Sequence, residues 1–383
     1  MTSLESNPAY ARLKHAYENP LAAALEKHRA GVLVAGYTSN TVPWELLRAA
    51  GFFPVLLQAH TRETPHADAY MEPVFTRRMR SLFEGLLSAK WSFLKTLVIP
   101  RTSEQEHKLY LYLSEVIRQG DGGSMPQPYL FNLLQTRSVQ SRAYGLEETK
   151  SLFAHLAGII GREARREDLV SAVTESNAAR SAVRRLLRLR RGKSPRLGGS
   201  EALRLIGAWY FMDRSEYSAE AEALVSQLSR RAPLQGPRIL IKGASLDHPA
   251  LHEAVEAVGA VVTAEDDWWA SRAVGRDIRT AGDPVRTIFE KYYLDAPSPR
   301  TFPHGTADRW FQAAVLRDID GVVFYLPLED DVLGWDYPRQ RRWLEEQGIP
   351  HLLIRDDARS LSGETRRCIG TFVAGLSRAR GSR

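Results

Sequence analysis

The sequence predicts an α/β protein with two similar parallel-sheet, Rossmann-like domains, a helical insert and an N-terminal helix. Short apolar runs typical of buried strands alternate with helical periodicity in two separate parts of the chain, which implies parallel strands joined by right-handed crossovers. One order of features (strand, glycine, polar loop, proline, helix, glycine, strand) occurs at 32–57 and again at 239–263. We therefore divide the chain into an N-terminal helical segment, a first α/β domain, a helical region and a second α/β domain, at 1–30, 31–144, 145–232 and 233–383.

The composition is that of a globular chain, with 383 residues, 44% hydrophobic and 25% charged, which is long enough for two cores. No apolar run approaches the roughly 20 residues that a bilayer requires, and the first ten residues lack a signal-peptide pattern, so we expect a cytoplasmic protein. One cysteine, Cys368, excludes a disulfide framework and a cluster held by this chain's cysteines alone. The net charge of +7 permits an anionic partner without naming one.

In the first part of the chain we expect one helix over 1–30, and then a strand at 32–35 that Gly36 closes. A helix over 43–50 follows, because Pro43 stands near its start and Gly51 just past its end. Further apolar runs predict strands at 53–57, 96–99 and 129–133.

The middle of the chain carries four segments with helical periodicity and no strand candidate, at 146–160, 167–189, 201–212 and 219–228. The strand pattern then returns at 239–243, 260–263, 321–325 and 351–354, before a final helix that starts near residue 363.

Ligands of open parallel sheets bind beyond the carboxyl ends of the strands, which selects the loops 37–41, 243–248, 265–269 and 327–331. In the first loop, Ser39, Asn40 and Thr41 precede a helix N-terminus, where free N–H groups favour an anion or a polarised carbonyl. The alternative is that one of these side chains only caps the helix, with Glu45 as a favourable charge in its first turn.

Other motifs in the sequence are compatible with more than one function. Asp266 and Asp267 could act on a ribose hydroxyl, on a metal ion or only as caps. No G-x-G-x-x-G follows either first strand and no P-loop or G-x-S-x-G is present, which disfavours a dehydrogenase, a simple nucleotide hydrolase and a serine hydrolase. A basic segment either docks phosphate, as on coenzyme A or nucleic acid, or is the solvated face of a long helix; it comprises Arg180, Arg184, Arg185, Arg188, Arg190, Arg191, Lys193 and Arg196.

Segment 36–55, GYTSNTVPWELLRAAGFFPV, resembles the opening motif of the 2-hydroxyacyl-CoA dehydratase/benzoyl-CoA reductase family, roughly G-Y-x-x-x-x-x-P-x-E-L followed by A-A-G and x-x-P-V. In the second domain, PRILIKG at 237–243, DHPAL at 247–251 and AEDD at 264–267 are similar to that family's motifs. The same holds for DGVVF at 320–324 and DYP at 336–338. The resemblance spans nearly the whole chain.

This resemblance implies a two-subunit enzyme that acts on an acyl-CoA thioester, with cysteines that bind a [4Fe–4S] cluster and a separate ATP-dependent activator that supplies an electron. It implies catalytic roles for Glu45, Ser39 and Asn40, the last two at the thioester carbonyl. It also implies that substrate is bound by Tyr37, Thr41, Ser245, Asp266 and Arg272.

The resemblance breaks at the cluster cysteines, where this chain has Glu72, Ser103 and, in the second domain, Glu329 or Asp330. Hard oxygen ligands are poorly suited to a cluster that needs thiolates, so we expect the [4Fe–4S] cluster only in a partner subunit. The first hypothesis is a cluster-free subunit that binds acyl-CoA and pairs with a cysteine-bearing paralogue, or with itself. The alternatives are a standalone enzyme that uses acid–base or metal chemistry through Glu72, Glu45 or Asp266, and a non-catalytic acyl-CoA-binding protein. No membrane or nucleic-acid partner is expected.

Overall fold

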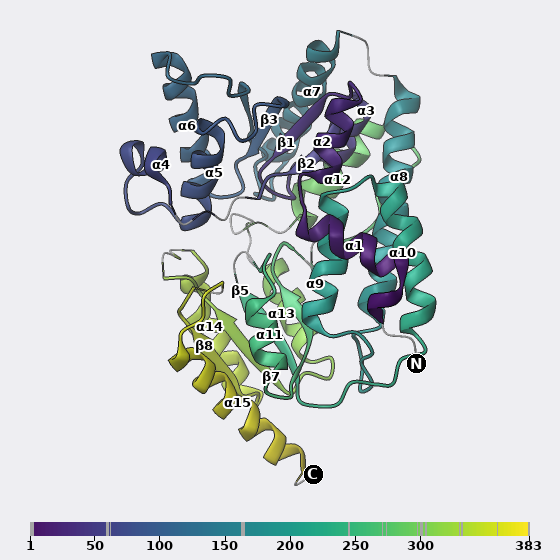
Figure 1. Ribbon diagram of the computed structural model, residues 1–383, viewed down its shortest axis with the longest axis vertical. Coiled ribbons are helices and arrows are strands. Elements are labelled where there is room, and N and C mark those ends of the chain that lie inside the picture. The colour runs from purple at the N-terminus through teal and green to yellow at the C-terminus, as the bar shows by residue number, and fades with distance from the viewer. Residues whose placement is uncertain are drawn as a thin grey trace.

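The computed structural model describes residues 4–58, 61, 63–161, 165–243, 246–269, 271–272, 274–296, 298, 302, 305–328, 330, 332–357 and 359–381. Within them lie two lobes, each built around a four-stranded parallel sheet (Figure 1). The predicted α/β fold with two Rossmann-like units is confirmed.

The two sheets share one strand order. The first has the order β2-β1-β3-β4, with β1 at Val34–Tyr37, β2 at Phe53–Leu56, β3 at Leu94–Pro100 and β4 at Pro128–Phe131. The second has the order β6-β5-β7-β8, with β5 at Arg238–Gly243, β6 at Val261–Asp266, β7 at Gly321–Tyr325 and β8 at His351–Ile354. The direction in which strands are added reverses between β1 and β3 in the first sheet and between β5 and β7 in the second. The loops after β1 and β3, and those after β5 and β7, therefore flank the crevices in which such sheets bind ligands.

The first strand begins and ends later than its apolar run predicts. Leu33 is 36% exposed, whereas every residue from Val34 to Tyr37 is buried. Gly36 therefore lies inside β1, paired with Val55 and Leu97, instead of closing it. A side chain at Gly36 would come within 2.8 Å of the Leu94 side chain, so the glycine allows a close approach and does not mark a turn.

The N-terminal segment is two helices where one was predicted, α1 at Pro8–Glu18 and α2 at Ala22–Arg29. Asn7 caps α1 by accepting hydrogen bonds from Ala9 N and Tyr10 N. Pro20 follows the end of α1, and its missing N–H and its ring prevent the helix from continuing. The helical periodicity on either side of Pro20 hides this break in the sequence.

The remaining helices cover the sheets and link the lobes. In the first lobe and the helical region they are α3 Trp44–Ala49, α4 Pro65–Tyr70, α5 Arg77–Leu87, α6 Glu104–Gln119, α7 Val139–Ile160, α8 Arg166–Arg188, α9 Gly199–Gly207 and α10 Arg214–Leu228. Those that follow are α11 Ala250–Glu256, α12 Pro284–Asp295, α13 Gly305–Val315, α14 Leu333–Glu346 and α15 Gly363–Gly381.

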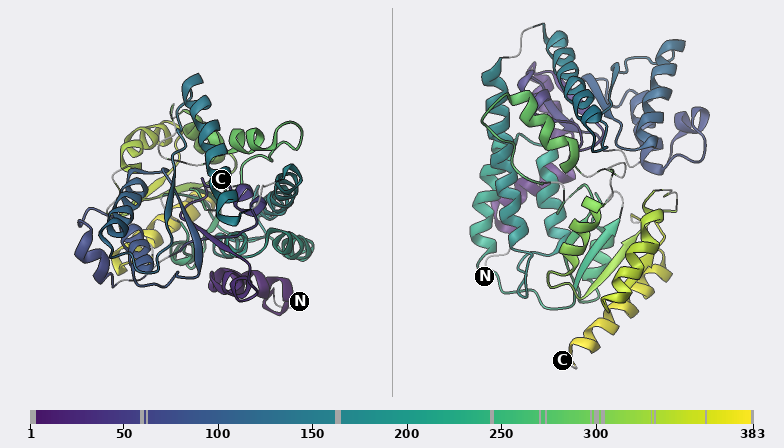
Figure 2. Two further views of the ribbon diagram at one scale, coloured as in Figure 1. Left: turned by 90° about the horizontal axis from the view of Figure 1, so that it is seen from above. Right: turned by 180° about the vertical axis from the view of Figure 1, so that it is seen from behind.

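One segment of the second half of the chain returns to the first lobe. Helix α12 packs against α7 and α8, as Figure 2 shows from behind, and Phe289 and Tyr292 are buried in the same core as β1 and β3. Separate apolar cores cover the two faces of the second sheet. In the part of the chain that is described, no helix combines the length and apolar character needed to cross a membrane.

Candidate functional site

The loop after β1 and the start of the segment after β3 meet at the crevice of the first sheet. Ser39 Oγ lies 3.0 Å from Thr41 Oγ1 and 2.9 Å from Thr102 Oγ1, so three hydroxyls form one cluster. Helix α3 begins at Trp44 with Pro43 at its N-cap position and no side-chain cap. The capping alternative for this loop is therefore wrong, because its polar side chains make other contacts.

Glu106, in the first turn of α6, lies beside the hydroxyl cluster and is fully buried. Its Oε1 accepts a hydrogen bond of 3.0 Å from Thr38 Oγ1. Burial raises the pKa of Glu106 above its ordinary value, and the nearby Arg78 guanidinium offsets only part of that rise. The sequence does not reveal this buried acid, because Ser103 and Glu106 have the spacing of an ordinary helix cap, and Ser103 Oγ does accept from Glu106 N.

Asn40 connects the loop to the second lobe. Its Nδ2 donates to the Trp268 carbonyl, just after β6, at 2.7 Å, while its Oδ1 is buried without a hydrogen-bond partner among the described residues. Arg78 lies over the Trp268 ring and donates to the Thr38 carbonyl. The first loop is thus enclosed by both lobes.

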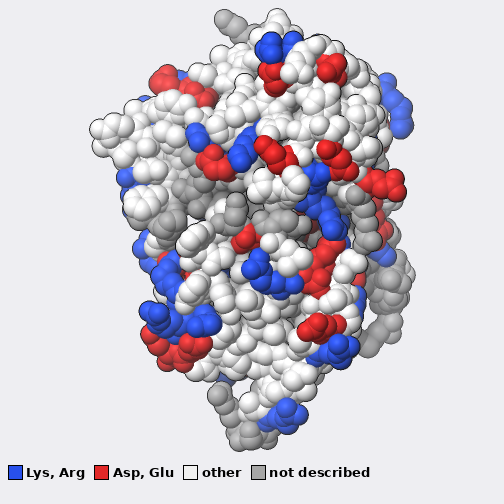
Figure 3. All heavy atoms as spheres, turned by 90° about the vertical axis from the view of Figure 1, so that its left-hand side faces the viewer, with Lys and Arg blue, Asp and Glu red and all other residues white. Residues whose placement is uncertain are grey.

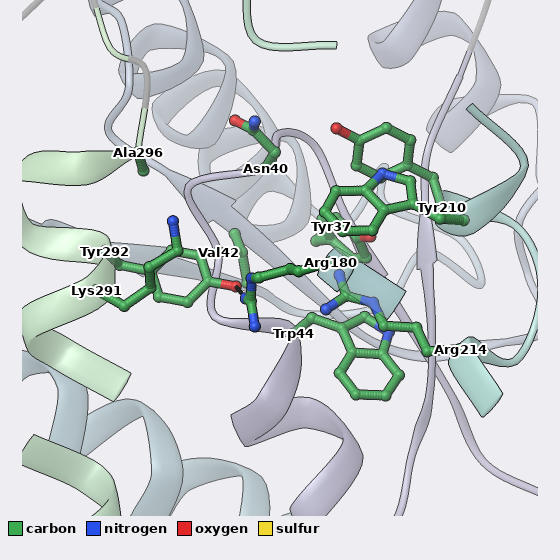
Figure 4. Close-up of a pocket in the computed structure, with 11 residues that line it drawn as sticks. Tyr37, Asn40, Val42, Trp44, Arg180, Tyr210, Arg214, Lys291, Tyr292 and Ala296 are labelled. Carbon is green, nitrogen blue, oxygen red and sulfur yellow. Dashed lines mark hydrogen bonds between the residues drawn. The ribbon is translucent and has the colours of Figure 1, made fainter. Parts of the chain in front are cut away.

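A small pocket opens on the other side of this loop (Figure 4). Its described lining residues include three cations and no acid: Tyr37, Asn40, Val42, Trp44, Arg180, Trp209, Tyr210, Arg214, Lys291, Tyr292 and Ala296. The cations come from α8, α10 and α12, which are far apart in the sequence. Arg214 is held between the Trp44 and Trp209 rings, 4.2 and 4.7 Å from their centroids.

Glu45 lies behind the pocket lining and is fully buried. Its Oε1 is 2.7 Å from Arg180 Nη2 and 3.5 Å from Arg214 Nη1, and its Oε2 accepts a hydrogen bond of 2.9 Å from the Tyr292 hydroxyl. Burial alone would raise its pKa, but the two guanidiniums outweigh burial and hold the pKa at about 2. Glu45 is therefore ionised at neutral pH and fixes the cations in place.

Lys291 is the pocket cation that makes no hydrogen bond or ion pair with any described residue. It is 5% exposed, and burial together with the charge of Arg180 lowers its pKa to about 8. The ammonium lies against Gly275, where an added Cβ would come within 2.2 Å of Nζ. A lysine on an amphipathic helix gives no sequence signal of such a position.

The basic segment is neither a simple solvated face nor one continuous patch. Arg180 and Arg190 are buried and paired with Glu45 and Glu265, while Arg184 and Arg185 pair with Asp277 and Glu222 at the surface. On a different face of the molecule, the one that carries α4 and α14, Lys and Arg side chains are likewise interspersed with Asp and Glu (Figure 3).

In the second lobe the structure brings together Asp266 and Arg272, two of the predicted binding residues, at 3.0 Å. Lys242, at the end of β5, also contacts Asp266. Burial raises the pKa of Asp266, but Lys242 and Arg272 outweigh it and the net pKa is lowered. Asp267 accepts from the backbone N–H groups of Leu246 and Trp269, as a turn residue would. Ser245 lies outside the described residues.

The three positions where the family resemblance calls for cysteine hold oxygen side chains with other partners. Glu72 is exposed and accepts a 2.7 Å bond from the Tyr112 hydroxyl, Ser103 caps α6, and Asp330 caps α14 through Leu333 N and Gly334 N. Glu329 lies outside the described residues, and Cys368 is exposed on α15. Within the described ranges, no three His, Cys, Asp or Glu residues gather as metal ligands.

Comparison with known proteins was decisive for the family. The model of the 2-hydroxyglutaryl-CoA dehydratase D-component matches residues 40–374. The chain belongs to this family. Within it, the chain is 22% identical to the (R)-phenyllactyl-CoA dehydratase beta subunit of Clostridium sporogenes, over 82% of this chain and 84% of that protein.

Two further relatives resemble the chain at similar levels. It is 20% identical to the (R)-2-hydroxyglutaryl-CoA dehydratase beta subunit of Acidaminococcus fermentans, over 92% of this chain and 95% of the relative. It is 22% identical to a benzoyl-CoA reductase subunit of Thauera aromatica, over 67% of this chain and 66% of the relative. The predicted family is confirmed, and its match includes the first loop from Asn40 onward and every cation of the pocket.

Proposed function

We propose that this chain is a subunit of a 2-hydroxyacyl-CoA dehydratase- or benzoyl-CoA reductase-like enzyme, that it contributes to acyl-CoA binding, and that it pairs with a cysteine-bearing paralogous subunit. The observation that carries the proposal is the enclosed loop 38–43 with its pocket, in a chain whose relatives are subunits of such enzymes. In this proposal Ser39 and Asn40 lie nearest the thioester, and Glu45 holds Arg180 and Arg214 in position.

The cluster belongs to the partner in this proposal, because the residues present here do not fit it. A [4Fe–4S] cluster needs thiolates. Carboxylate and hydroxyl oxygens at Glu72, Ser103 and Asp330 are hard ligands, and each is already used in a hydrogen bond of the fold. No step of the reaction is therefore assigned to a cluster bound by this chain.

Anaerobic purification with and without the products of neighbouring genes tests the proposal. We expect the chain alone to carry no iron and to show no dehydration or reduction of an acyl-CoA, and its complex with a cysteine-bearing paralogue to carry iron and turn over. The paralogue alone is the control. Stoichiometric iron and the absorbance of a four-iron centre in the isolated chain would contradict the proposal.

A standalone acid–base enzyme is the second candidate, and one observation favours it. Glu106 is a buried acid whose pKa is raised by burial, and it lies next to the Ser39, Thr41 and Thr102 hydroxyls, where it could exchange a proton with a bound substrate. Under this alternative the isolated chain turns over an acyl-CoA, and Glu106→Gln abolishes that turnover while leaving acyl-CoA affinity unchanged. If only the complex with a paralogue is active, this candidate is rejected.

A further inference from the structure

We propose that the pocket beside loop 38–43 binds a chloride ion as a structural ligand and that Lys291 is the main donor to it. The pocket face carries three cations, the guanidiniums of Arg180 and Arg214 and the Lys291 ammonium. Glu45, which lies behind the lining, balances one of these charges, so the group keeps an excess of two positive charges. Buried charge of one sign is unfavourable unless a counter-charge enters.

Donors on two of these cations remain for a ligand. Lys291 is 5% exposed and makes no hydrogen bond or ion pair with any described residue, and its nitrogen points toward the space between Ala296 and Asn40 (Figure 4). Arg214 Nε is buried and likewise has no hydrogen-bond partner among the described residues. Arg180, in contrast, already donates to side chains of α3 and α8. A buried donor without an acceptor costs free energy, so the first two donors call for an anion in the pocket.

No described acid is left to neutralise the Lys291 ammonium. The two acids whose charges act on it are Asp295 and Glu45. Asp295, on the same helix, pairs with Arg276 at the surface, and Glu45 is engaged with the two pocket arginines. The three tyrosines of the lining stay neutral, because burial raises the pKa of each. The counter-charge for this pocket therefore comes from solution.

The size and enclosure of the pocket select a monatomic ion. The pocket has room for about one water-sized species, and chloride is little larger than a water molecule, whereas a tetrahedral oxyanion is much larger. Every described lining residue except Asn40 is buried. An anionic group at the end of a long chain would need a channel through this lining, and a free ion does not.

A chloride ion in this position holds two distant parts of the chain together. Lys291 comes from α12, in the second half of the chain, and Asn40 comes from the loop after β1. The same loop carries Ser39 and Thr41 of the hydroxyl cluster. The ion offsets the repulsion among the pocket cations and so keeps α12 against this loop. This role goes beyond the proposed function and does not rest on it.

Thermal melts of the full chain in sodium gluconate, with sodium chloride added at constant ionic strength, test the proposal. We expect the melting temperature of the wild type to rise with chloride and then level off, because the ion binds only the folded chain. Bromide should act alike, whereas sulfate and acetate should not. In Lys291→Met the chloride affinity should fall roughly tenfold to hundredfold, the range for losing a hydrogen bond to a charged group.

Lys150→Met, at a surface lysine of α7, is the matched control and should respond to chloride as the wild type does. Lys291→Gln, which also removes the charge, should lose the response and replaces Lys291→Met if that variant misfolds. Three outcomes would each overturn the proposal: equal responses to chloride in the wild type and the Lys291 variants, a rise of the same size with sulfate, or a response to acetate and not to chloride.

Bromide also locates the ion, because its anomalous X-ray scattering identifies it in a crystal. We expect an anomalous peak within hydrogen-bonding distance of Lys291 Nζ in wild-type crystals grown with sodium bromide, and none at that place in Lys291→Met. A wild-type pocket without this peak, at a bromide concentration that saturates the thermal shift, would contradict the proposal. Neither experiment uses an acyl-CoA or a partner subunit, so the chloride site and the proposed function can fail separately.

Discussion

Arg180 and Arg190 lie ten positions apart at the end of α8 and just beyond it, and each forms a buried ion pair with a different lobe. Arg180 contacts Glu45 of the first lobe, and Arg190 contacts Glu265 at the end of β6 in the second. Glu265 also lies 3.2 Å from His252 Nε2 and accepts from Ser271 at 2.7 Å. Helix α8 and the residues just after it therefore contact both lobes through two desolvated ion pairs.

Replacing Arg190 with glutamine should destabilise the protein by about 3–5 kcal/mol, because it leaves the Glu265 carboxylate buried without its guanidinium. Arg184→Gln, six positions earlier and within α8, is the control. It breaks a half-exposed pair with Asp277, so the free energy of unfolding should fall by no more than about 1 kcal/mol. Urea unfolding of both variants checks this, and equal losses would show that burial of the Arg190 pair does not matter.

Gly36→Ala should lower the free energy of unfolding by about 1–3 kcal/mol, because the new methyl group would lie 2.8 Å from the Leu94 side chain in the first sheet. Gly158→Ala is the matched control, since α7 has open space there and alanine is the better helix former by roughly 0.5–1 kcal/mol. Thermal melts should therefore shift in opposite directions, and a stabilised Gly36→Ala would contradict the close packing of β1.

The sequence was sufficient for the fold and insufficient for the site. Alternating apolar runs and the repeated glycine–proline pattern are local signals, and they predicted both sheets. The contacts that define the pocket join Glu45 to Arg214 and Tyr292, which lie 169 and 247 positions further along the chain, and no local pattern encodes such pairing. The position of Asn40 after the first strand singles it out, and the family motif adds a role for Glu45, while Lys291 carries no motif at all.

Glu106→Gln should change how stability depends on pH. An acid whose folded-state pKa is raised above 4.5 binds more protons in the native state than in the unfolded state. Its contribution to stability therefore falls as the pH rises from 4.5 through the folded-state pKa. The glutamine variant lacks this loss and should become more stable relative to the wild type as the pH rises from 4 toward neutrality. Denaturant unfolding across this range measures the difference.

Glu115→Gln on the same helix is a control, because its stability relative to the wild type should change with pH in the opposite direction. A hydrogen bond from Arg118 lowers the pKa of Glu115 to about 2, so this carboxylate stabilises the native state above pH 4.5 and loses that effect toward pH 2. Its variant should therefore lose stability relative to the wild type as the pH rises. Parallel slopes in the two variants would show that Glu106 is not a desolvated acid.

Lys291→Met should stabilise the unliganded protein. The pKa of Lys291 falls from 10.5 to about 8, which at 1.36 kcal/mol per unit corresponds to roughly 3 kcal/mol of instability. The pH dependence of this cost follows from the protonation of Lys291 in the native and unfolded states. Below pH 8 both states are charged and the full cost is present, and between pH 8 and 10.5 the native state loses its proton first and the cost disappears. The variant's advantage should thus be largest at pH 7 and vanish by about pH 10.5, as measured by urea unfolding. A variant that is less stable than the wild type at pH 7 would show that the buried charge of Lys291 does not cost stability.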